Sequence, residues 1–140
     1  MDTTWIVVAS RDEVRIFERK GKKDLTLVTD IGNPEGKLRP RDLVSDKAGT
    51  SSDNRMRRRL AYSTEQSPKE RSLINFYEEI SDQIDLALNK QKFDRLILIA
   101  EPRLLGILRA ILPSSVHGVI IQEIHKDLAF ATEEQIMERL

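Results

Sequence analysis

Residues 93–113 read Phe93-Asp-Arg-Leu-Ile-Leu-Ile-Ala-Glu-Pro-Arg-Leu-Leu-Gly-Ile-Leu-Arg-Ala-Ile-Leu-Pro113 and join an apolar run directly to a segment with helical features. The run at 96–100 is unbroken and too short to span a membrane, so it predicts a central strand covered on both faces. Pro102 is compatible with a first helical turn, and Pro113 ends the helix. Most side chains between the prolines are apolar, which predicts a largely buried helix. The stretch indicates an α/β core and specifies no reaction by itself.

The segments before this stretch predict three strands. Residues 5–9 form a continuous run rich in β-branched side chains, typical of an interior strand. Val14 and Ile16 indicate a second strand with one solvated face. Alternate apolar or β-branched positions from 25 to 31 indicate a third. The short polar connections between these segments predict an antiparallel meander.

The remaining segments alternate helices with strands. Ser67-Pro-Lys-Glu70 has the pattern of a capping box, and an apolar stripe at helical spacing follows it as far as Leu88. A strand is expected over 118–124, and Thr132-Glu-Glu-Gln135 predicts the cap of a terminal helix. The order predicts an α/β fold in which a mixed five-stranded sheet, an antiparallel three-strand meander followed by parallel strands, carries flanking helices. This is a ribonuclease H-like arrangement.

Length and composition limit the classes of protein. The 140 residues suit one domain, residues 1–140, and the 23 basic and 23 acidic side chains balance. Overall charge therefore points to neither nucleic acid nor an anionic membrane. The absence of cysteine excludes disulfides and thiolate metal sites. Because no segment has the ~20 apolar residues of a membrane span, and the N-terminus lacks the basic region of a signal peptide, we expect a soluble cytoplasmic protein.

Residues 32–66, which we call the basic loop, show no sustained apolar period and begin with the turn sequence Gly32-Asn-Pro-Glu-Gly36. Eight basic and three acidic residues lie between Lys37 and Arg59, a local net charge of +5. A solvated charged loop would account for this excess, but guanidinium groups also suit phosphates. The candidate ligand-binding residues are Arg39, Arg41, Arg55, Arg57, Arg58 and Arg59, with Arg103, Lys126 and Asp127 as possible secondary ones.

Several short sequence motifs occur in the same order as in a known bacterial family. They are Thr4-Trp-Ile-Val-Val-Ala9, Asn33-Pro-Glu-Gly36, Asp46-Lys-Ala-Gly49, Lys126-Asp-Leu128 and most of residues 94–109. Over nearly its whole length the chain resembles the family named host attachment proteins. That family is similar to the middle domain of archaeal and eukaryotic peptide-chain release factors and of Pelota. The resemblance therefore implies a ribonuclease H-like, translation-factor fold.

The residues needed for catalysis do not come together in the sequence. Release factors of this kind act through a Gly-Gly-Gln tripeptide, and no two glycines are adjacent here. A ribonuclease H nuclease needs several carboxylates at strand ends to hold two Mg²⁺ ions. Glu101 and Asp127 are instead expected to cap elements or pair with Arg103 and Lys126. The two histidines lack metal-ligand spacing, and no nucleotide-binding motif is present. We expect no enzyme, no cofactor and no metal site.

Two functional hypotheses remain from the sequence. The first is a non-catalytic binding module that engages RNA or the ribosome through the basic loop. With only Tyr62 nearby for base stacking, such binding would be directed mainly at the phosphate backbone. The alternative is a protein-interaction or regulatory module linked to host-cell attachment, whose arginines contact an acidic protein surface and which has no nucleic-acid partner.

Overall fold

The computed structural model describes residues 2–22, 25–33 and 67–140, and the strands in these ranges form one five-stranded sheet. The strand order is β3-β2-β1-β4-β5. The strands are β1 (Thr3–Ala9), β2 (Glu13–Lys20), β3 (Thr26–Gly32), β4 (Arg95–Ala100) and β5 (Ile120–His125). β2 is antiparallel to β1 and β3, whereas β1, β4 and β5 are parallel to one another. The predicted α/β fold with a mixed sheet is confirmed.

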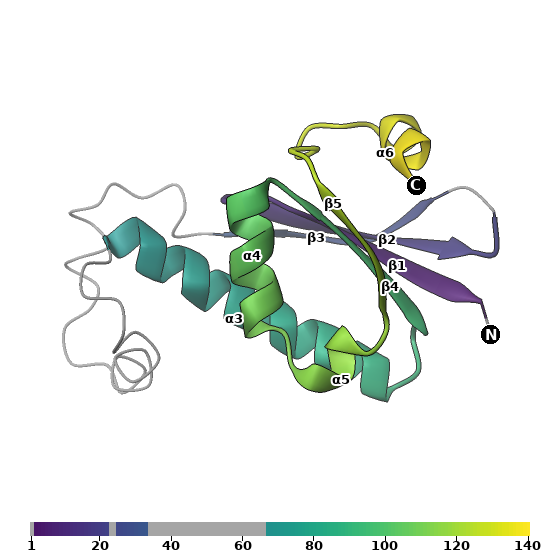
Figure 1. Ribbon diagram of the computed structural model, residues 1–140, viewed down its shortest axis with the longest axis horizontal. Coiled ribbons are helices and arrows are strands. Elements are labelled where there is room, and N and C mark those ends of the chain that lie inside the picture. The colour runs from purple at the N-terminus through teal and green to yellow at the C-terminus, as the bar shows by residue number, and fades with distance from the viewer. Residues whose placement is uncertain (1, 23–24, 34–66) are drawn as a thin grey trace.

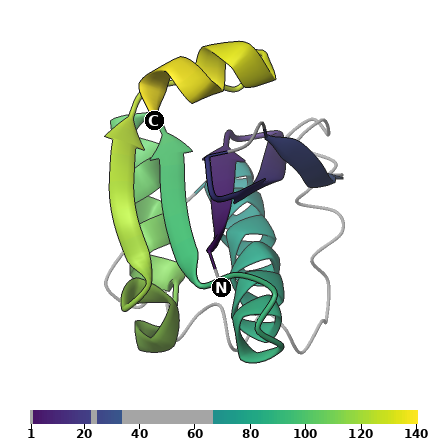
Figure 2. The ribbon, with the colours of Figure 1, turned by 90° about the vertical axis from the view of Figure 1, so that its right-hand side faces the viewer.

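Helices cover both faces of the sheet. α3 (Pro68–Asn89), α4 (Pro102–Ile111) and the short α5 (Ser114–His117) lie on one face, and α6 (Glu133–Arg139) lies on the other (Figure 1). In the end-on view, α6 crosses near the arrowheads of β4 and β5 (Figure 2). The sequence analysis did not predict α5. Pro113 ends α4, as expected, but it also stands at the N-cap of a single further turn, which is too short to show a helical period.

β4 lies at the centre of the core, as residues 96–100 predict. Leu96, Leu98 and Ala100 join a cluster with the buried side chains of α3 and α4. Ile97 and Ile99 point to the opposite face and belong to a second cluster, which we call the α6-side cluster. Its buried members are Ile6, Val8, Phe17, Leu25, Ile97, Ile99 and Ile136. Burial on both faces explains why β4 shows no apolar–polar alternation.

β3 differs from its predicted pattern. Regular alternation from 25 to 31 would place all odd-numbered side chains on one face. Instead, Leu25 joins the α6-side cluster, whereas Ile31 packs on the face that carries α3. The pairing with β2 shifts so that Val28 is an extra residue, and a bulge of this kind reverses the faces on either side of it. Leu27 and Val28 are consequently 46% and 43% exposed on this edge strand.

The helix starts use most of the predicted caps. The Thr132 hydroxyl and the Gln135 side chain form both halves of the capping box of α6. Ser67 accepts a hydrogen bond from the backbone N–H of Glu70, 3.2 Å away, at the start of α3. The Glu70 carboxylate, however, contacts Arg103 of α4. The polar residue that the pattern assigned to a local cap therefore links two helices.

Candidate functional site

The six arginines of the basic loop lie outside the residues that the structure describes: Arg39, Arg41, Arg55, Arg57, Arg58 and Arg59. The three secondary residues, Arg103, Lys126 and Asp127, are described and lie just after the carboxyl ends of β4 and β5. Lys126 is exposed, and Arg103 is about half exposed. The structure thus places the secondary residues at one edge of the sheet, and it is there that a candidate site can be built.

A pocket of about 550 Å³ occupies this edge. The carboxyl ends of β1, β4 and β5 point the same way because the strands are parallel, and crevices at such ends commonly bind ligands in α/β proteins. Residues that follow the three strands meet the end of β3 here. We call it the strand-end pocket; it is lined by Ser10, Arg11, Asp12, Glu13, Gly32, Glu101, Leu104, Asp127, Ala129 and Phe130.

The turn between β1 and β2 forms one wall of the pocket and is held in place by hydrogen bonds. The Ser10 hydroxyl donates to the Glu13 carbonyl at 2.9 Å and accepts from the Glu13 N–H at 3.2 Å. From α3, the Tyr77 hydroxyl donates to the Ser10 carbonyl at 2.9 Å. Burial raises the pKa of Tyr77 well above its usual range, so the phenol stays a neutral donor. Arg11 and Asp12 are therefore presented from an anchored turn.

Glu70 organises the cations beside this turn. Its carboxylate accepts a hydrogen bond from Arg103 and lies 4.0 Å from the Arg11 guanidinium. The hydrogen bond and charge of Glu70 raise the pKa of Arg103 above its ordinary value. Of the two roles expected for Glu101, a cap or a partner of Arg103, the second is not seen, because Arg103 binds Glu70, 33 residues earlier in the chain. Arg103 is thus already engaged by a carboxylate.

The two strand-end carboxylates act as caps. Glu101 is the N-cap of α4, and its side chain accepts from the Leu104 N–H at 3.3 Å. Asp127 accepts from the Ala129 N–H at 3.1 Å and tightens the turn after β5. This agrees with the structural role expected for both. Within residues 2–22, 25–33 and 67–140, no three histidine, aspartate or glutamate side chains are grouped closely enough to hold a metal ion.

Ala129 and Phe130 form the second wall, and Arg15 of β2 holds the segment 128–131 to which they belong. The Arg15 guanidinium donates to the carbonyls of Leu128, Ala129 and Ala131 at 2.9, 2.8 and 3.0 Å. It also lies 5.4 Å from the centroid of the Phe17 ring. These partners lie 113 to 116 residues away from Arg15 in sequence. The sequence analysis missed Arg15, because no local pattern marks so distant a contact.

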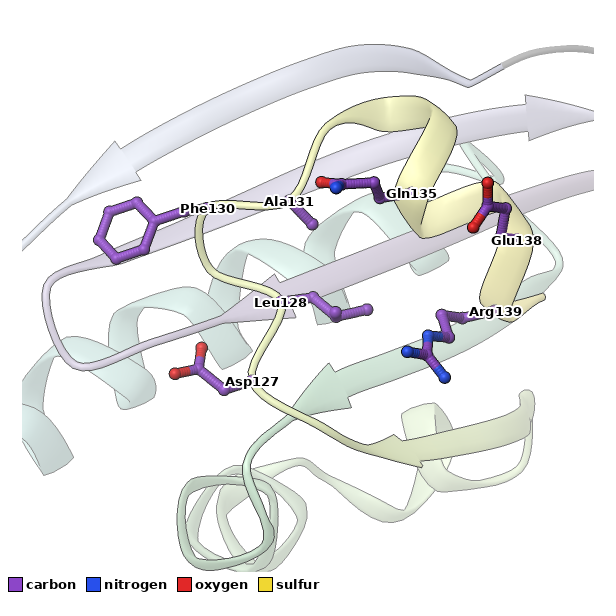
Figure 3. A pocket seen from close by; sticks show the side chains of 7 residues that line it. All are labelled: Asp127, Leu128, Phe130, Ala131, Gln135, Glu138 and Arg139. Atoms are coloured by element: carbon purple, nitrogen blue, oxygen red, sulfur yellow. The ribbon is translucent and has the colours of Figure 1, made fainter.

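Phe130 projects from this held segment and is 96% exposed. It borders the strand-end pocket and also a second hollow of about 360 Å³ on the side of α6. The second hollow is lined by Asp127, Leu128, Phe130, Ala131, Gln135, Glu138 and Arg139. Phe130 and Arg139 lie at its opposite ends, with Leu128 between them (Figure 3). The sequence analysis also missed Phe130, since exposure cannot be seen in one isolated aromatic residue.

In the part of the chain that the structure describes, no helix combines the length and apolar character needed to cross a membrane.

Comparison with solved structures finds this fold in part of an archaeal translation termination factor and a weaker likeness in another archaeal protein. One, the translation termination factor aRF1, gives a TM-score of 0.50 at 10% identity, covering 98% of this chain and 37% of that one. Another, described as an archaeal protein, gives a TM-score of 0.48 at 11% identity, covering 98% of this chain and 35% of that one. The chain thus spans just over a third of their length. No curated protein matches the sequence. The family model described as "Protein required for attachment to host cells" matches residues 5–140, so the chain belongs to that family.

Proposed function

We propose that this chain is a non-catalytic binding module that engages RNA or the ribosome through the basic loop. The observation that carries the proposal is the net charge of +5 between Lys37 and Arg59 in a chain whose overall charge is zero. Arginine side chains bind phosphates through paired N–H donors, and each phosphate contact releases counterions. The cytoplasm, where translation takes place, is the compartment that this function implies.

Three features support the absence of catalysis and the choice of partner. Glu101 and Asp127 stand at strand ends, where a ribonuclease H-like nuclease needs metal ligands, and both are used as caps. The fold is that of a translation termination factor, which makes the ribosome the first partner to test. No Gly-Gly pair is present in the sequence to supply the tripeptide of such factors. We therefore propose binding without peptidyl-tRNA hydrolysis.

Co-sedimentation with ribosomes across a series of salt concentrations tests this function. The parent chain should bind at low salt and dissociate steeply as salt rises. Each basic-loop arginine that contacts a phosphate should contribute about one unit to the logarithmic salt slope. A variant with four of these arginines replaced by glutamine should bind more weakly and with a shallower slope: Arg55→Gln, Arg57→Gln, Arg58→Gln and Arg59→Gln.

The matched control removes the same total charge from the described part of the chain, at the end of β2 and between α3 and β4. It replaces four exposed lysines by glutamine: Lys20, Lys22, Lys90 and Lys92. This control should retain the parent's salt slope, because its lysines lie away from the basic loop in sequence. If the parent fails to sediment with ribosomes at any salt concentration, or if both variants lose binding equally, the basic loop is not an RNA-binding element.

A second candidate function is a protein-interaction module linked to attachment, as the family description suggests. The exposed Phe130 between two hollows specifically favours it, since aromatic side chains are enriched at the centres of protein interfaces. Under this hypothesis the chain would not associate with ribosomes, and the basic loop would contact an acidic protein surface instead. The salt series above separates the two functions.

A further inference from the structure

Phe130 is an exposed aromatic side chain with an unusually well-held backbone. Single exposed apolar residues are common and need no explanation. Here, however, the Arg15 guanidinium binds the carbonyls of the two residues before Phe130 and of the residue after it. The segment is also tied at its start by the hydrogen bond between Asp127 and Ala129. The ring therefore projects from a fixed backbone, and a prearranged group loses little conformational entropy on binding.

Phe130 borders two hollows of the protein surface. The strand-end pocket of about 550 Å³ lies on one side, and the hollow of about 360 Å³ beside α6 lies on the other. Asp127 and Phe130 line both. A partner that covered Phe130 could therefore place a side chain in each hollow, and hot spots of interfaces cluster where side chains fill such pockets and exclude water.

The charges that line the strand-end pocket are mostly negative, and the two cations at the same edge of the sheet, Arg103 and Lys126, are not among its lining residues. Four carboxylates and one guanidinium, that of Arg11, line the strand-end pocket. Arg11 lies 4.0 Å from Glu70, which offsets part of its charge. The second hollow adds Glu138 and Arg139, one charge of each sign. A phosphate backbone would be repelled here, whereas a lysine or arginine side chain would be attracted by the carboxylates and by the face of the Phe130 ring.

We propose that Phe130 and the strand-end pocket form a docking surface for a basic segment of a partner protein. The segment places a lysine or arginine side chain in the strand-end pocket and an apolar side chain against Phe130. This surface carries a charge opposite to that of the basic loop and uses different residues. The proposal is therefore independent of ribosome binding and is tested by a separate experiment.

The test selects peptides from a displayed random library on the parent chain, with counter-selection on Phe130→Ala. Peptides recovered in this way should combine lysine or arginine with a neighbouring apolar residue. Fluorescence anisotropy with a recovered, labelled peptide should show binding weakened roughly tenfold or more by Phe130→Ala. Asp127→Asn keeps an oxygen that can accept from the Ala129 N–H while removing one charge, and it should weaken binding and its dependence on salt.

Matched controls use exposed side chains of α3. Leu86→Ala removes an apolar side chain that is 54% exposed, and Asp82→Asn removes an exposed carboxylate. Both should bind the peptide as the parent does. All four variants should melt at the parent's temperature, because each substituted side chain is exposed.

Four results of the peptide experiment would overturn the proposal. They are a selection that enriches no peptide, enrichment of peptides without basic residues, equal binding by the parent and Phe130→Ala, and equal loss in the α3 controls. RNA binding or self-association of the parent that Phe130→Ala abolishes would also overturn it, by assigning the surface to nucleic acid or to a second copy of this chain.

Discussion

Arg15 joins the antiparallel part of the sheet to the connection between β5 and α6. Replacing it by methionine keeps an apolar stem beside Phe17 but removes three hydrogen bonds of 2.8 to 3.0 Å. Hydrogen bonds to charged groups contribute about 1.5–3 kcal/mol each. The three carbonyls belong to partly exposed residues and can turn to water in the variant, so each bond contributes less than this range, about 0.7–1 kcal/mol. We expect Arg15→Met to lower the free energy of unfolding by about 2–3 kcal/mol.

Urea denaturation measures this loss, and hydrogen exchange locates it. A domain of this size has a total stability of roughly 5–15 kcal/mol, so the variant should remain folded. Amides of residues 126–140 should exchange faster, whereas those of β4 should stay protected. Arg15→Lys should give an intermediate loss, because an ammonium point charge cannot match the planar guanidinium fork. Unchanged exchange at 128–131, with stability within about 0.5 kcal/mol of the parent, would refute the role of Arg15 as a tie.

Other substitutions test the core and the turn at the strand-end pocket. Leu98→Asp should unfold the chain, because it buries a carboxylate in the central strand; a native circular dichroism spectrum and melting temperature would contradict this. Tyr77→Phe should cost about 1 kcal/mol in urea denaturation by removing the bond to Ser10. Burial raises the pKa of Tyr77 in the folded state, so the stability that its neutral form contributes is complete below the unfolded pKa of ~10. Above that pH the contribution falls by up to ~1.4 kcal/mol per pH unit. Tyr77→Phe lacks this group and should therefore lose less stability than the parent as the pH rises above ~10.

Strands and helices that show a local periodicity could be predicted from the sequence. Contacts between residues far apart in the chain could not. The unbroken run at 96–100 identifies β4 because burial on both faces of the sheet requires an apolar side chain at every position. The bulge at Val28 is invisible in the sequence, since regular alternation continues through it. Likewise, Glu70 has the spacing of a capping residue, and only the approach of α4 to α3 turns it towards Arg103. Arg103, Lys126 and Asp127 stay predictions as ligand-binding residues, and the contact of Arg103 with Glu70 could not be predicted because it joins two helices.

Under the docking proposal, the strand-end pocket binds a partner protein rather than a metal ion, because its strand-end acids already accept backbone hydrogen bonds. Three parallel strands bring their carboxyl ends together, so whatever follows them must meet at this edge. In this chain β1 and β4 end in alanine, and the acids after β4 and β5 bind backbone N–H groups. These two carboxylates line the pocket beside Phe130 together with those of Asp12 and Glu13. The edge where a nuclease would place its metal ligands is therefore suited, in this chain, to recognising a positively charged partner.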